Sequence, residues 1–435
     1  MTRGNNILKR IDLNLGRFLV KAAWCVILSV AMGCILMISV YLLPTDRIRD
    51  NIAETSEMLE REGVYYQWAE GYKNAQSDNY SDASLYLNAM YPGSGNVVKD
   101  AMNNPRRLYG DDNNEESAVI MANGRDEGKQ SHDVNYGRYW HGSLVFLKPL
   151  LLAFDISDIR FFSVIIHFGL LFLIVAGFVK RKITDALPGF FMAIIMLNPI
   201  SMVMCYCYSV EYTMTLAGAV LILYFHEFFQ KGQNYFYYFL FSGICTVYFN
   251  ELCFPMVVFG VSMILYLLLS EEKGWILVKK QLLLGICWGA GYVLMWMGKW
   301  ICAWALTGFN YFAEALGQVL RYTSDHATWE IENPAVSDRL AKNMNVYAKW
   351  PFAFLILLVG VLTAVCFWRK KQAGNKMSVN RMLPYFLMVV FPFSVYIVLG
   401  NGYAYVHYWF THRLLVVSVF AGTSMILQSM ESASE

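Results

Sequence analysis

Long apolar runs recur along this 435-residue chain and restrict its fold more than any other feature. The runs at residues 22–43, 161–179 and 282–306 are each long enough to cross about 30 Å of hydrocarbon. Only 16% of the residues are charged, against about 25% in soluble domains. Because backbone polar groups in hydrocarbon must be bonded within their own segment, such runs form helices. The sequence therefore predicts an all-α polytopic membrane protein.

About ten apolar segments are predicted to be transmembrane helices. Basic clusters give their direction, because cytoplasmic loops carry an excess of Lys and Arg. Such clusters lie in the N-terminal tail and at residues 180–182 and 369–371. We therefore expect a multi-pass cell-membrane protein with both termini in the cytoplasm. The predicted helices are residues 22–43, 161–179, 187–203, 210–225, 235–249, 254–269, 282–306, 351–368, 383–399 and 414–427.

This topology divides the chain into loops and helix blocks. The longest loop is extracytoplasmic, follows the first helix and includes an interfacial helix at residues 144–154. The predicted order is a cytoplasmic tail (1–21), the first transmembrane helix (22–43), the extracytoplasmic loop domain (44–160), a six-helix block (161–306), a second large extracytoplasmic loop (307–349), three C-terminal helices (350–428) and a cytoplasmic tail (429–435).

The polar part of the first loop, residues 44–142, is acidic. It carries 17 acidic and 10 basic side chains, which excludes the basic surface that nucleic acids select. None of the nine cysteines lies in it, so no disulfide framework is expected there. We expect a helix at 45–62, a second helix that begins at Ser81 as N-cap, and an exposed loop at 103–129.

Asp82 is the candidate catalytic base of this insert. It lies in the first turn of the predicted second helix, where the helix dipole stabilises its ionised form. An ionised carboxylate that faces a polar pocket removes a proton from a hydroxyl. The alternative is an ordinary helix-start aspartate that only complements the dipole.

No sequence pattern predicts a metal or another cofactor. Asp111 and Asp112 are suited to a divalent cation, but their Gly- and Asn-rich surroundings also fit a solvated turn. Cys205 and Cys207 flank one tyrosine near a predicted membrane edge, and no further cysteine or histidine pair completes a site. We expect the cysteines to be small apolar packing residues.

Several charged and histidine side chains fall in the predicted outer segments and are candidates for binding a donor phosphate or another part of a substrate. Arginine suits this role because it stays charged and offers bidentate donors. Interfacial aromatic belts with snorkelling side chains are the alternative, for these residues and for Lys299. The candidates are Arg138, His141, Glu251, Arg321, His407, His412 and Arg413.

This layout resembles the GT-C class of integral-membrane glycosyltransferases. These have a cytoplasmic N-terminus and a long first outer loop that carries an acidic catalytic residue, the role that the resemblance gives Asp82. The stretch at residues 248–255 is similar to an aromatic, acidic and proline-containing stretch of uncharacterised bacterial membrane proteins of this type. Asn250 replaces its acidic residue here, with Glu251 next to it. Residues 407–413 are similar to their last outer loop.

The resemblance implies transfer of a sugar from a polyprenyl-phosphate-linked donor to an extracytoplasmic glycan or lipid acceptor. Asp82 would deprotonate the acceptor, and Arg413, His407, Arg321 or Arg138 would neutralise the departing phosphate. Membrane lipids and these substrates are the expected partners. The alternatives are an envelope-polysaccharide polymerase or ligase, a non-enzymatic lipid or polysaccharide transporter, and a structural membrane protein.

Overall fold

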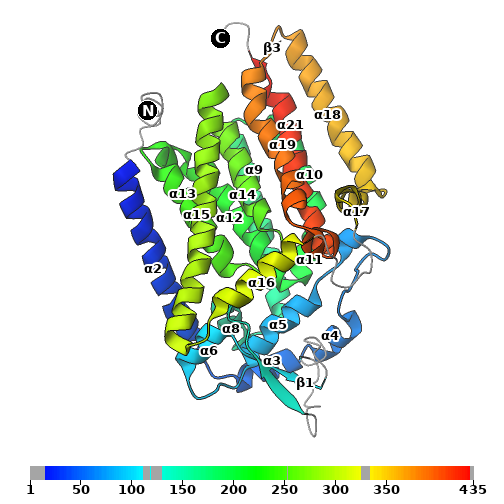
Figure 1. The fold of residues 1–435 in the computed structure, drawn as a ribbon. Coiled ribbons are helices and arrows are strands. Elements are labelled where there is room, and N and C mark those ends of the chain that lie inside the picture. The colour runs from blue at the N-terminus through cyan, green and yellow to red at the C-terminus, as the bar shows by residue number, and fades with distance from the viewer. Residues whose placement is uncertain (1–14, 111–117, 119–129, 252, 325–333, 432–435) are drawn as a thin grey trace.

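The computed structural model describes residues 15–110, 118, 130–251, 253–324 and 334–431. Its main part is a bundle of long helices, and the insert covers one end of that bundle (Figure 1). The bundle helices are α2 (Leu15–Tyr41), α9 (Ile156–Lys180), α10 (Leu187–Leu197), α11 (Pro199–Met204), α12 (Tyr206–Gln230), α13 (Asn234–Phe249), α14 (Pro255–Leu269), α15 (Gly274–Thr307), α18 (Phe352–Gln372), α19 (Val379–Val398) and α21 (Leu415–Gln428).

The chain is an all-α polytopic membrane protein, as predicted. Seven helices in the described ranges are long and apolar enough to cross a membrane, namely α2, α9, α12, α15, α18, α19 and the segment Tyr408–Gln428. All ten predicted segments contain a helix, but α10, α13 and α14 are shorter than the other seven. The membrane class is therefore confirmed, whereas the count of about ten crossings stays a prediction.

The two ends of the bundle differ. Helix α2 begins and α21 ends at the end opposite the insert, which lies at the lower end of Figure 1. The basic last turn of α18, Arg369–Lys371, belongs to the upper end, where the short strands β3 (Lys376–Met377) and β4 (Met430–Glu431) pair. This arrangement fits the predicted positions of both termini on one side.

The insert is mostly helical, and a small sheet completes it. Strand β1 (Arg106–Tyr109) pairs antiparallel with β2 (Ser131–Val134), so the expected loop at 103–129 begins with a strand. Residues 111–117 and 119–129, including Asp111 and Asp112, lie outside the described residues. The helices and single turn are α3 (Asp46–Ala53), α4 (Ser56–Glu62), η1 (Lys73–Ala75), α5 (Asn79–Met90), α6 (Val97–Asn103) and α8 (Leu144–Leu151).

Two local expectations for the insert are wrong. The predicted helix at 45–62 is two helices, α3 and α4, with a break at Glu54 and Thr55. Helix α5 begins earlier than expected, because Asp78 and not Ser81 is its N-cap and accepts a hydrogen bond from the Ser81 amide (3.1 Å). Helix α8 packs on α2, α3 and α5 with four of its eight residues buried, whereas Phe146 is 55% exposed. Its interfacial position stays a prediction.

The predicted helix at 187–203 is also divided. Helix α10 ends where Asn198 takes a left-handed backbone conformation (φ 64°), and Pro199 begins α11. Asparagine tolerates this conformation better than most residues, and proline suits a first helical turn. Cys205 is extended, and α12 begins directly after it. The last residue of α10, the short helix α11 and the first residue of α12 therefore lie within ten residues of sequence, at the insert end of the bundle.

The two later loops that are predicted to lie outside also contain helices. The second contains α16 (Tyr311–Thr323), which crosses the insert end of the bundle in Figure 1, and α17 (Val336–Ala348). The third contains the π-helical segment η3 (Asn401–Tyr405), the short helix α20 (Tyr408–Thr411) and the 3₁₀ turn η4 (His412–Leu414). Helix α16 packs on η3, which joins the two loops.

We predict that the insert end faces the outside of the cell. A cysteine introduced at exposed Ser131 should react with a membrane-impermeant maleimide in intact cells. A cysteine at exposed Gln372, at the other end of the bundle, should react only after lysis. Mass tagging relative to wild type measures both. The reverse labelling pattern would overturn the orientation.

Candidate functional site

Asn74 of the insert fills the break between α10 and α11. Its carbonyl accepts hydrogen bonds from Asn198 Nδ2 (3.2 Å), Ser201 Oγ (3.1 Å) and Arg413 Nη2 (3.3 Å). Its side-chain amide donates to the Met196 carbonyl (2.7 Å). Backbone groups freed by a helix break at membrane depth need such partners. Asn74 therefore joins the insert to the bundle.

Arg413 and His412 are fully buried at the same junction. Arg413 also donates to the carbonyls of Leu197 (3.3 Å) and Trp409 (3.0 Å). His412 Nδ1 contacts a main-chain carbonyl (2.8 Å), so its Nε2 is the acceptor for the Asn74 amide (3.1 Å). These bonds support the packing of the insert. The predicted phosphate-binding role of both residues stays a prediction.

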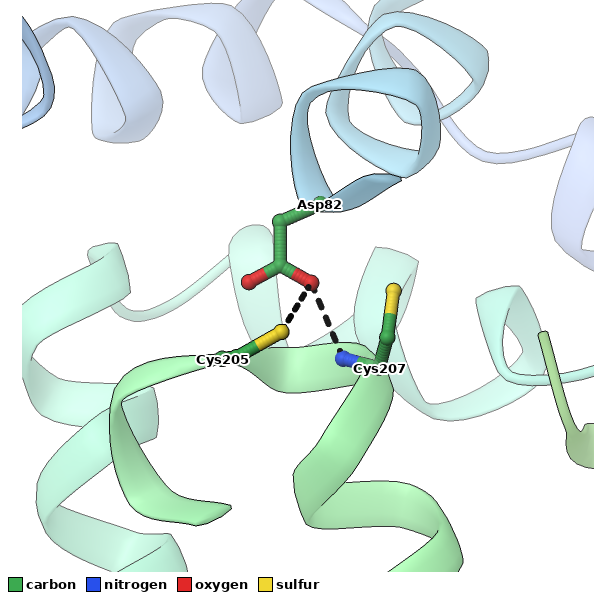
Figure 2. A group of neighbouring side chains, drawn as sticks. All are labelled: Asp82, Cys205 and Cys207. Atoms are coloured by element: carbon green, nitrogen blue, oxygen red, sulfur yellow. Dashed lines mark hydrogen bonds between the residues drawn. The ribbon is translucent and has the colours of Figure 1, made fainter. Parts of the chain in front are cut away.

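Asp82 caps the beginning of α12 from the insert. Figure 2 shows its carboxylate directed from α5 onto the start of α12. Oδ2 accepts from the Tyr206 amide (2.7 Å), and Oδ1 accepts from the Cys207 amide (2.9 Å) and the Cys205 thiol (3.5 Å). The first amides of a helix have no partner within the helix, and a carboxylate satisfies them well. Asp82 therefore acts as a helix cap supplied by a distant segment.

Burial raises the pKa of Asp82 above its usual range, although hydrogen bonds from Cys207 and Tyr206 oppose the shift. Both oxygens already accept hydrogen bonds, and the residue is 1% exposed. A base must reach the hydroxyl that it deprotonates. The geometry thus favours the structural alternative for Asp82, and its catalytic role stays a prediction.

Glu251 and His141 form the partly accessible acid–base pair of the site. His141 Nδ1 lies 3.0 Å from the Glu251 carboxylate, and the Glu251 side chain is 13% exposed. His141 is buried in a left-handed backbone conformation (φ 51°), and its Nε2 has no hydrogen-bond partner among the described residues. Gly142 donates from its amide to the Tyr248 carbonyl (2.8 Å), a close approach that a Cβ would prevent. This contact fixes the insert beside the end of α13.

Arg106 is the cation that the sequence analysis missed. Its guanidinium lies over the Tyr136 ring (4.6 Å) and donates to Ser84 Oγ (2.6 Å), and it interacts electrostatically with Glu251. It is only 9% exposed. The sequence around Arg106 predicts an exposed loop, and the run Arg-Arg-Leu-Tyr is its one signal for a strand. Its pairing with β2 brings Arg106 inward.

Arg138 lies next to this group. Its guanidinium packs over the rings of Tyr136 (4.1 Å) and Tyr139 (4.9 Å) and forms an ion pair with Glu314 of α16. Its carbonyl accepts hydrogen bonds from two indoles of α15, those of Trp296 (2.8 Å) and Trp300 (2.9 Å). Arg138 therefore holds α16 against the insert and places a cation near Tyr136.

The other predicted cations form a second, aromatic group. The His407 ring contacts the rings of Tyr322, Tyr403 and Trp409 at 5.0 to 6.1 Å. Burial, with a contribution from nearby Arg321, lowers the pKa of His407 to about 4. His407 is therefore uncharged at neutral pH. The predicted role of Arg321 and His407 in binding a donor phosphate stays a prediction.

Glu211 and Lys299 are also fully buried. Glu211 accepts a hydrogen bond from the Phe254 amide (2.7 Å) just before α14, in the same way that Asp82 caps α12. Lys299 is fully buried and donates to the Ala101 carbonyl of α6 (3.3 Å). The expectation that Lys299 snorkels to lipid headgroups is wrong, because the insert covers it.

An apolar cavity of about 480 Å³ lies beside the Asn74 junction. Its walls come from the insert, from the α10–α11 break and from the beginning of α18. An apolar wall of this kind suits a hydrocarbon chain. The lining residues are Trp68, Ala69, Tyr72, Ala75, Ile195, Asn198, Pro199, Ile200, Pro351, Phe352 and Leu355.

Comparison with protein-family models, with curated proteins and with solved structures gives no significant match for this chain. The function is therefore argued from its own residues.

We predict that Asp82→Asn destabilises the fold. An amide offers one acceptor oxygen in place of two, so an amide of α12 loses its partner, at a cost of roughly 1–3 kcal/mol. The melting temperature of the detergent-solubilised protein should fall. Asp158→Asn, at an exposed position in the first turn of α9, is the control and should change it little. Equal melting temperatures for the two variants would contradict the capping role.

We also predict that Asp78 makes stability depend on pH. Burial raises the pKa of Asp78 to about 6, above its ordinary value of 3.8. Between these two values the folded protein binds a proton that the unfolded chain lacks, so stability rises as the pH falls from about 6 to about 4. Asp78→Asn keeps a good N-cap. This variant should be more stable than wild type at pH 7, and the difference should shrink at pH 4. The same difference in melting temperature between variant and wild type at both pH values would contradict this assignment.

Proposed function

We propose that this protein is a membrane glycosyltransferase of the GT-C class. It transfers a sugar from a polyprenyl-phosphate-linked donor to an extracytoplasmic glycan or lipid acceptor, at the insert end of the bundle. The observation that carries the proposal is the Glu251–His141 pair, a partly exposed carboxylate bonded to an imidazole (3.0 Å) where the insert meets the bundle.

Glu251 is the proposed general base, and His141 is its positioning partner. A carboxylate at a partly exposed position can take the proton of an acceptor hydroxyl as the oxygen attacks the sugar. The bond from the anomeric carbon to the donor phosphate then breaks, and the bonding electrons leave with the phosphate. Asp82 is less suited to this step, because α12 already engages both of its oxygens.

Arg106 and Arg138 are the proposed electrostatic partners of the departing phosphate. Both guanidinium groups lie over the ring of Tyr136, at 4.6 and 4.1 Å, so they occupy one small region. The Tyr136 ring packs on the ring of His141 at 5.2 Å between centroids, so this region lies next to the Glu251–His141 pair. Cations held in a water-poor site stabilise developing negative charge more strongly than cations in water do.

The apolar cavity beside Asn74 supports a lipid-linked donor. Its walls include residues of the membrane helices α10 and α18 as well as residues of the insert. A prenyl chain can therefore extend from the membrane region toward the insert without exposure to water.

Glu251→Gln should abolish sugar transfer while leaving the melting temperature close to that of wild type. The amide keeps the size and one acceptor of the carboxylate but does not accept the proton. The assay supplies a polyprenyl-phosphate-linked sugar and cell-envelope acceptors to purified protein. Glu227→Gln is the matched control, because Glu227 is an ion-paired glutamate at the opposite end of the bundle.

The outcomes separate the alternatives. Wild-type transfer by Glu251→Gln would remove Glu251 from the base role. A folded Asp82→Asn variant without transfer would return that role to Asp82. Absence of transfer by wild type, combined with substrate-dependent flux across vesicles, would support a transporter.

A further inference from the structure

Asp82, Cys205 and Cys207 form a compact group of metal-ligating side chains. One ligand atom from each lies within 4.8 Å of the other two. The three residues are 1%, 0% and 1% exposed. Figure 2 shows the Asp82 carboxylate above the start of α12, with the Cys205 thiol directed toward it. Two segments more than a hundred residues apart thus bring three ligands together.

The spacing fits a tetrahedral metal ion. Zinc binds thiolate sulfur at about 2.3 Å and carboxylate oxygen at about 2.0 Å, so a tetrahedral ion separates the two atoms by about 3.5 Å. The separation of Cys205 Sγ and Asp82 Oδ1 is 3.5 Å. Two tetrahedral thiolates lie about 3.8 Å apart, which is within about 1 Å of the upper bound of 4.8 Å for this group.

The donor atoms select the kind of metal. Two sulfur ligands favour thiophilic ions over Mg²⁺ and Ca²⁺, which prefer oxygen. The single carboxylate favours Zn²⁺ over Cu(I), which is selected by softer ligand sets. Three protein ligands leave one tetrahedral position for water or for the second carboxylate oxygen.

We propose that Asp82, Cys205 and Cys207 bind a zinc-type divalent ion that fastens the insert to α12. Binding replaces two thiol protons, which pass to solvent, with one divalent ion. The group carries a net charge of −1 before and after this exchange. The N-terminus of α12 favours that negative charge. The site is independent of the proposed transfer step, which uses neither cysteine.

Co²⁺ is the spectroscopic probe for this site. The full-length protein, purified in detergent with reduced thiols, should bind one Co²⁺ with a thiolate-to-cobalt charge-transfer band in the near ultraviolet. Zn²⁺ should displace it. The Cys205→Ser/Cys207→Ser variant should lose the band, and either single variant should keep about half of its intensity. Zn²⁺ should raise the melting temperature of wild type but not of the double variant.

Cys25→Ser/Cys366→Ser is the matched control, because it also removes two cysteines, both from other helices. It should retain the band and the thermal shift. Absence of a charge-transfer band in wild type would overturn the proposal. A band of full intensity in either single variant would also overturn it. The single variants keep the proposal testable if the double variant does not fold. The sugar-transfer assay of Glu251→Gln tests the proposed function separately, and its result does not depend on any of these outcomes.

Discussion

The structure depends on satisfying backbone groups where membrane helices break. Helix α10 stops at Asn198, and α12 begins after Cys205, so carbonyls and amides are freed at an end of the bundle. In hydrocarbon, each unsatisfied group costs several kcal/mol. Three hydrogen bonds from Asn74 and Asp82 satisfy main-chain groups of the bundle, those of Met196, Tyr206 and Cys207. In return, three bundle side chains donate to the carbonyl of Asn74. The insert is therefore part of the membrane fold and not an appended domain.

Two buried carboxylates accept hydrogen bonds from main-chain amides at the beginnings of helices. Asp82 caps α12, and Glu211 within α12 engages the amide of Phe254 before α14. A carboxylate from another segment satisfies helix amides only if that segment is correctly placed, so each cap also positions its own element. These two caps link the insert to α12 and α12 to the start of α14. Residues 250–251 lie between the Tyr248 carbonyl, which accepts from the Gly142 amide, and the Phe254 amide, which donates to Glu211.

The position of the insert also makes two of the acidic side chains differ in accessibility, Asp82 and Glu251. Asp82 is closed to a substrate hydroxyl, because it is 1% exposed and two amides and a thiol donate to its oxygens. Glu251 has one imidazole partner and an exposed edge. Arg106 and Arg138 share the ring of Tyr136 beside it. The groups that the proposed transfer requires, a base, a positioning group and cations, therefore lie together where the insert meets the bundle.

The sequence by itself determined the membrane class, the helical segments and the insert, because hydrophobic length and charge are local properties. It also predicted Arg138, His141 and Glu251 as candidates, and the structure brings His141 and Glu251 together. Only the tertiary structure decided which acid is capped and which is accessible. The partners of Asp82 lie 124 and 125 residues away in the chain, and the inward position of Arg106 depends on a strand pairing. Contacts over such separations leave no periodic signal in the sequence, so their geometry follows from packing alone.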